Sequence, residues 1–99
     1  MRKANVSGVT SLISPSSSAS AVVINNDAKN AYIDFINIKA LRADICVYDI
    51  LGRTAWQQKN TNIASGKYTI NGSNFTSGVY VVKVVVDGQV TTQKVVFEQ

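Results

Sequence analysis

Residues 79–88 read VYVVKVVVDG, and this stretch decides the fold class. Apart from Lys83, its first eight residues are all valine or tyrosine, which strands favour. Because side chains along a strand alternate between two faces, the single charge marks the solvent face. That face also carries Val79, Val81 and Val85. The predicted core face carries Tyr80, Val82, Val84 and Val86.

Glycine and asparagine mark the places where the chain must reverse. Asp87-Gly88 supplies the positive φ of a two-residue type I′ turn, so the last two strands should form an antiparallel hairpin. Residues 50–53 read ILGR, and Gly52 permits a second reversal there. Two further reversals are expected at residues 25–27 and 71–74. No segment indicates a helix longer than one turn.

The same pattern of strands and turns continues through the chain from Ala21 onward. Short runs rich in Val, Ile, Tyr, Phe and Thr alternate with Gly, Asn, Asp and Ser. Residues 44–50 read DICVYDI and are apolar on both faces, as expected of a central strand. The pattern predicts an all-β sandwich of two antiparallel sheets. Its seven strands are expected near residues 21–25, 31–38, 43–50, 53–59, 67–71, 79–87 and 89–98.

A change of composition near residue 20 marks the domain boundary. The chain has 99 residues, enough for one domain. Residues 14–21 read SPSSSASA, which is the composition of a flexible linker. We therefore predict that residues 1–20 are a flexible Ser-rich linker or an added segment, and that residues 21–99 form the sandwich. The apolar residues before Ser14 fit a vector remnant, a native linker or an extra edge strand.

The composition of the chain argues against catalysis and against metal or nucleic-acid binding. It has no histidine. Its net charge is +4, and its Lys and Arg residues are spread along the sequence rather than gathered as in a nucleic-acid binder. Cys46 is the single cysteine, which we interpret as a small buried core residue. No apolar run approaches the length of a membrane span. We expect no enzyme, no cofactor, no metal and no nucleic-acid partner.

Two segments go beyond generic strand patterning. Residues 43–53 read ADICVYDILGR, and residues 77–84 read SGVYVVKV, followed by Asp87-Gly88 and a terminal KVV. In this order they resemble the C-terminal sorting domain of proteins exported by the type IX secretion system of Bacteroidetes, the type A Por secretion tail. The resemblance covers about residues 21–99. The motif residues that carry it are Gly52, Arg53, Gly78, Val79, Tyr80, Lys83, Asp87, Gly88, Lys94, Val95 and Val96.

The resemblance implies an Ig-like antiparallel β-sandwich of about seven strands that acts as a folded signal. A cargo domain would precede it, pass through the periplasm and cross the outer-membrane translocon to the cell surface or the medium. In typical members a surface sortase then cuts the linker. The matching linker here is Ser16, Ser17, Ser18, Ala19, Ser20 and Ala21. Residues 24–28 lack the two prolines usual in the family, so a domain that stays uncleaved is an open alternative.

Several structural and functional alternatives remain open from the sequence. A retained adhesive or carbohydrate-binding module would use aromatic side chains to stack on sugar rings. The available aromatics are Trp56, Tyr32 and Tyr68. Lys83 and Lys94 fit either partner contact or edge lysines that discourage strand addition. Gly78 fits a backbone requirement or direct recognition, and edge strands leave a homodimer open.

Overall fold

The computed structural model describes residues 19–99. The predictions for residues 1–18 lie outside the described residues. The elements are β2 (Ala21–Asn26), β3 (Asn30–Ile36), β4 (Arg42–Asp49), β5 (Thr54–Asn62), β6 (Lys67–Asn71), the 3-10 helix η1 (Gly72–Asn74), β7 (Gly78–Val86) and β8 (Gln89–Phe97). Each predicted strand is present, and β5 continues beyond its expected end at residue 59.

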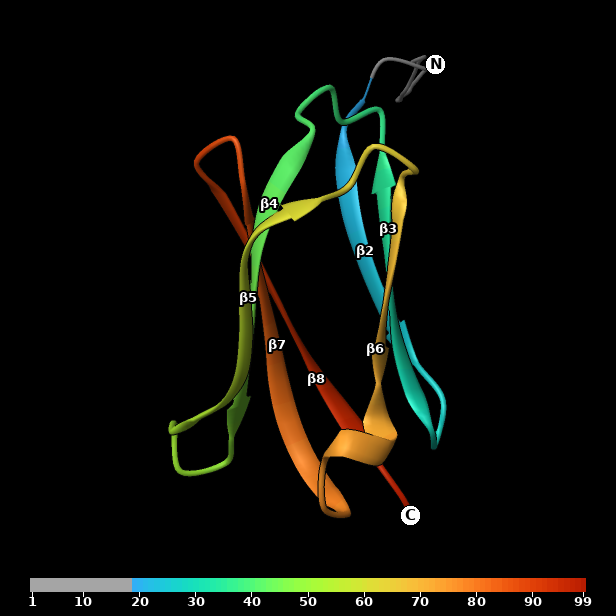
Figure 1. The fold of residues 1–99 in the computed structure, drawn as a ribbon, viewed down its shortest axis with the longest axis vertical. Helices are drawn as coiled ribbons and strands as arrows, with labels where there is room; N and C mark the ends of the chain where they lie inside the picture. Colours follow the sequence, from blue (N-terminus) through green and yellow to red (C-terminus); the bar gives the residue numbers. More distant parts are fainter. Residues whose placement is uncertain (1–18) are drawn as a thin grey trace, which may run out of the picture.

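The strands form two antiparallel sheets that face each other (Figure 1). One sheet has the order β2-β3-β6 and the other the order β5-β4-β7-β8. β4 lies between β5 and β7, so the prediction of a central strand is confirmed. The prediction of an antiparallel β-sandwich is confirmed.

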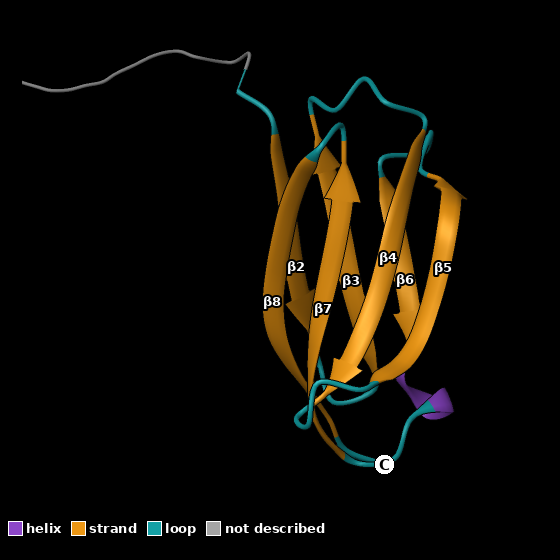
Figure 2. Cartoon of the chain, turned by 90° about the vertical axis from the view of Figure 1, so that its left-hand side faces the viewer, coloured by secondary structure: helices purple, strands orange, loops and turns teal. Residues whose placement is uncertain are grey.

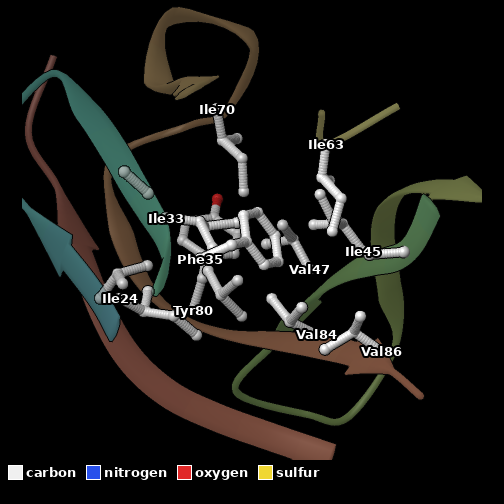
Figure 3. Packing of buried hydrophobic residues seen from close by; sticks show 14 of the residues in the cluster. Ile24, Ile33, Phe35, Ile45, Val47, Ile63, Ile70, Tyr80, Val84 and Val86 are labelled. Atoms are coloured by element: carbon white, nitrogen blue, oxygen red, sulfur yellow. The ribbon is translucent and has the colours of Figure 1, made fainter. Parts of the chain in front are cut away.

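The core fills the space between the sheets (Figure 3). On β7 the predicted core face is confirmed, because its four residues are buried whereas Val79 and its alternating neighbours are partly exposed. Both sheets contribute to the core, so neither can hold its apolar face away from water alone. The largest fully buried side chains are Phe97, Ile33, Ile45, Val47, Val82, Val84 and Val95.

The last hairpin has the predicted turn. Val86 pairs with Gln89, which leaves Asp87 and Gly88 as a two-residue loop. Their φ angles are 52° and 75°, as a type I′ turn requires at both central residues. The turn chemistry of this dipeptide therefore sets the register of β7 against β8.

Cys46 is buried, as expected, but not in the core between the sheets. Ile45 and Val47 belong to the intersheet cluster, so Cys46 points to the outer face of the sheet. Its ladder partners are Gln57 on β5 and Lys83 on β7, and its Sγ lies 3.8 Å from Gln57 Oε1. The sequence could not show this because an apolar central strand does not reveal which face looks inward.

The two ends of the sandwich differ in what they carry (Figure 2). At one end, which we call the linker end, the chain enters β2 and the β7–β8 turn lies nearby. Ser20, Asn37 and Asp87 line the same pocket there. The other end, the C-terminal end, carries the β4–β5 turn, η1 and the C-terminus. The described chain therefore begins at the end of the sandwich opposite the β4–β5 turn.

Candidate recognition surface

The β4–β5 turn is organised by Asp49. The Gly52 N–H donates to the Asp49 carbonyl oxygen at 2.9 Å, and the Asp49 N–H donates to the Arg53 carbonyl oxygen at 2.9 Å. The Asp49 side chain accepts the N–H groups of Leu51 and Arg53 at Oδ1, and the Arg53 guanidinium at Oδ2 over 2.8 Å. Gly52 has φ 83°, which closes the three-residue loop at low steric cost.

These contacts set the protonation of Asp49. Partial burial raises the pKa of its carboxyl, but the backbone N–H and guanidinium of Arg53 and the N–H of Leu51 outweigh burial, so the pKa is lowered. At the β2–β3 turn the Tyr32 hydroxyl, followed by the N–H groups of Asn30 and Lys29, lowers the pKa of Asp27 in the same way. Both carboxylates are therefore charged acceptors that hold turns at the C-terminal end.

Acid should weaken the domain through these two carboxylates. A folded-state pKa below the ordinary value means that the charged form stabilises the fold above about pH 4, and that this contribution is lost as pH falls through the folded pKa. We expect urea unfolding to show a falling free energy of unfolding below about pH 4. The decline should be shallower in Asp49→Asn. Equal slopes for wild type and Asp49→Asn would contradict the assignment.

Pairing between β4 and β7 brings the two motif segments together. Tyr48 pairs with Val81 and Asp49 pairs with Tyr80, so the β4–β5 turn lies beside the start of β7. Gly78 opens β7 with φ 155°, which explains the glycine without any partner. A hollow at this junction is lined by Asp49, Ile50, Ser77, Gly78, Val79 and Tyr80. Residues far apart in the sequence thus form one surface.

Four apolar side chains are exposed at this junction. Ile50 and Leu51 at the tip of the turn are 74% and 72% exposed. Val79 borders the hollow, and its ladder partner on β8 is Val96; both are more than a third exposed. The sequence analysis selected Gly52, Arg53, Val79 and Val96 but missed Ile50 and Leu51, although they stand directly before Gly52 in the DILGR segment.

The two motif lysines lie on the outer face of the four-stranded sheet. Lys83 Nζ is 5.8 Å from the centroid of the Tyr48 ring, and Lys94 pairs with Val81. β8 is an edge strand, so Lys94 fits an edge lysine that discourages strand addition. β7 lies between β4 and β8, so this interpretation is wrong for Lys83.

The remaining motif residues lie elsewhere. Asp87 and Gly88 form the turn at the linker end, and Val95 points into the core. The Tyr80 ring is buried and its hydroxyl donates to the Thr76 carbonyl oxygen at 2.8 Å. That hydrogen bond satisfies the hydroxyl within the domain. Of the predicted motif, the structure therefore brings Gly52, Arg53, Gly78, Val79 and Val96 to one exposed end.

The aromatic residues considered for sugar stacking do not form a shared platform. Trp56 and Tyr68 have ring centroids 6.4 Å apart, and both pack against the core at the β5–β6 side. Tyr32 is on β3, where its neighbour Ile33 points inward, so the Tyr32 ring lies on the outer face. Its hydroxyl donates to Asp27 Oδ2 at 2.8 Å. These roles are structural.

Within residues 19–99 no group of three or more His, Cys, Asp or Glu side chains is placed to hold a metal ion. In the same part of the chain, no helix has the length and apolar character that a membrane span requires.

The described residues form a small antiparallel β-sandwich with an ordered, exposed turn at one end. The sequence matches the family model described as the secretion system C-terminal sorting domain over residues 15–98. The chain belongs to this family, whose members are sorting signals of type IX secretion. Membership implies export to the cell surface or the extracellular space.

A solved structure shows the same architecture. It is the crystal structure of a DUF3244 family protein with an immunoglobulin-like β-sandwich fold from Bacteroides vulgatus ATCC 8482. The TM-score is 0.65 at 15% identity, covering 78% of this chain and 84% of that chain. At this identity the likeness concerns the fold alone, and it confirms the Ig-like sandwich. The search of curated proteins finds no match.

Proposed function

We propose that this domain directs an N-terminally attached cargo from the periplasm through the type IX outer-membrane translocon to the cell surface. Family membership supports the sorting role. The observation that carries the mechanism is the junction of β4 and β7, which gathers both motif segments into one exposed end. The described chain begins at the opposite end of the sandwich, so this surface does not adjoin the point where a preceding cargo is attached.

The domain works by being recognised in its folded state, without chemistry of its own. The motif residues are contributed by β4, β7, β8 and the turn between β4 and β5, so an unfolded chain would not bring them together. Neither a metal nor a cofactor enters this proposal. The partners are the translocon and, for processing, a surface sortase.

We place sortase cleavage N-terminal to Ala19. Ala21 is already paired with Ile36 in the β2–β3 ladder, and the Ala19 carbonyl oxygen accepts a hydrogen bond from Asn37 Nδ2 at 2.9 Å. A protease needs an extended backbone that is free of such pairing. Cleavage would therefore use the earlier serines of the predicted linker, Ser16, Ser17 and Ser18, and leave Ala19, Ser20 and Ala21 with the domain.

A fusion experiment tests export. The full chain is placed behind a periplasm-targeted fluorescent protein and expressed in a type IX-competent bacterium and in its translocon-deficient mutant. We expect the reporter at the surface or in the medium of the first strain only. Equal retention in the periplasm of both strains would refute the proposal.

Mass spectrometry of the exported reporter tests processing in the same cultures. A mass loss equal to the domain and a new C-terminus before Ala19 are the expected results. Full-length reporter at the surface would show that the domain is retained. This result would refute the proposed cleavage but not the proposed export.

A further inference from the structure

The tip of the β4–β5 turn carries residues that the fold itself does not require. Turns favour Gly, Asn, Asp, Ser and Pro because these residues adopt or support turn geometry. Here Asp49 and Gly52 already meet those requirements. Ile50 and Leu51 nevertheless place two adjacent bulky apolar side chains in water. Single exposed apolar residues are ordinary, but this adjacent pair, of which Ile50 lines a hollow together with Val79, forms a small apolar patch and a candidate binding surface.

The turn holds this pair in a fixed position. Two backbone hydrogen bonds close the loop, and three more reach the Asp49 carboxylate, one of them from the Arg53 guanidinium. A group that is already ordered loses less conformational entropy on binding, so preorganisation favours affinity. The tip is thus prepared as an anchor rather than as a mobile loop.

The apolar surface continues from the tip onto the sheet. The hollow behind Ile50 is bordered by Val79, and Gly78 contributes no side chain to it. A Cβ added to Gly78 would lie 3.9 Å from Tyr80 Cε1, in van der Waals contact with the ring. Val96 extends the surface beside Val79. The arrangement is a protruding pair with a hollow next to it.

We propose that Ile50 and Leu51 insert as an anchor into an apolar pocket of a protein receptor of the outer-membrane translocon, with Val79 and Val96 at the rim of the contact. This inference rests on the proposed function and names the surface that performs it. The binding energy of a protein interface is concentrated in a few side chains that become buried and are surrounded by weaker contacts. The tip lies at the end of the sandwich opposite the linker end, so it does not adjoin the point where a cargo is attached.

The surroundings favour a protein pocket over a lipid surface or a second copy of the chain. Lipid-binding surfaces combine apolar groups with clusters of Lys and Arg. At this tip the Arg53 guanidinium is paired with Asp49 at 2.8 Å, and Lys83 and Lys94 lie further along the sheet, level with Thr92 and Val81. The tip and its rim supply fewer than the about 20 to 30 residues that each partner contributes to a stable interface, so the proposed contact is a transient one and not a permanent dimer.

The test compares two variant fusions, one altered at the tip of the β4–β5 turn and the other at the linker end of the domain. The double variant Ile50→Ser, Leu51→Ser removes the anchor, and Leu41→Ser is the matched control. Leu41 is 64% exposed and precedes β4, at the linker end. Both fusions are expressed in the competent strain with the wild-type fusion beside them. Circular dichroism and urea unfolding of the purified chains verify that each variant is folded.

We expect export of the double variant to fall about tenfold or more while Leu41→Ser is exported like wild type. Export of the double variant at the wild-type level would overturn the anchor and leave the sorting function standing. Retention of the wild-type fusion would overturn both. If the double variant does not fold, the single variants Ile50→Asn and Leu51→Asn, which suit a turn, replace it with the same criteria.

A competition experiment measures binding apart from export. Excess wild-type chain, produced in the periplasm without cargo, should reduce export of the wild-type fusion, whereas the double variant should not compete. Equal competition by both chains would overturn the anchor. Flotation with anionic lipid vesicles and sedimentation of the free chain test the other occupants: lipid binding or dimerisation that is lost in the double variant would overturn the protein pocket.

Discussion

Replacing Phe97 by alanine is expected to lower the free energy of unfolding by about 3 to 5 kcal/mol, a large part of the stability of a domain of this size. The side chain is fully buried although it is two residues from the C-terminus of the chain. Its ring centroid lies 5.3 Å from that of Phe75 and 5.8 Å from that of Tyr80. Removal would leave a cavity among three aromatic rings, which urea unfolding would measure.

Val96→Ala is the control for this prediction. Val96 is the preceding residue of β8 but points to the outer face and is partly exposed, so its truncation should cost about 1 kcal/mol or less. Similar losses in the two variants would contradict the assignment of Phe97 to the core.

C-terminal truncations should reduce export through the same loss of stability. A truncation that removes Phe97 would abolish export by unfolding the domain, whether or not the last residues touch a receptor. Its effect must therefore be read together with an unfolding curve. Val96→Ala, by contrast, would leave the fold intact and report on the rim of the proposed contact.

Replacing Gly72 by alanine is expected to cost about 3 kcal/mol. A Cβ at this position would overlap the Lys29 carbonyl oxygen and would lie 2.7 Å from Phe97 Cδ1. The backbone cannot move away freely, because the Gly72 N–H donates to the same carbonyl oxygen at 2.7 Å. Strain would thus reach both the β2–β3 turn and the aromatic cluster, and thermal unfolding would show a lower Tm.

Ser73→Ala serves as the neighbouring control for Gly72→Ala. Ser73 is exposed, and its backbone N–H would still donate to Asn71 Oδ1. Its substitution should change stability by about 1 kcal/mol or less. Unchanged stability of Gly72→Ala would show that the chain at η1 moves aside readily, contrary to the close packing described above.

Gly72 also illustrates where sequence reasoning reaches its limit. The segment Asn71–Asn74 was predicted as a reversal, and the structure places η1 there. A glycine in such a place suggests a positive φ, yet Gly72 is not among the glycines with one. Its role is to let two segments approach closely, and a contact with Lys29 and Phe97 has no local signature in the sequence.

The motif lysines show the same limit from another side. From the sequence, Lys83 and Lys94 look alike, since each is a lysine within a predicted strand. Sheet order separates them, because β8 is an edge and β7 is not. The sequence analysis did not select the tip residues Ile50 and Leu51, because the sequence does not show whether an apolar residue is buried or exposed in the fold.

The sequence by itself determined the strands, the core face of β7 and the type I′ turn at Asp87-Gly88. These features depend on the alternation of side chains along a strand and on the φ angles that a turn residue tolerates, which are properties of neighbouring residues. Its two motif segments also identified the family. Only the tertiary structure decided that β4 lies against β7, which face of β4 holds Cys46, and that the motif junction projects away from the linker. Those outcomes follow from packing the two sheets against each other. The free energy of that packing depends on contacts between residues far apart in the chain.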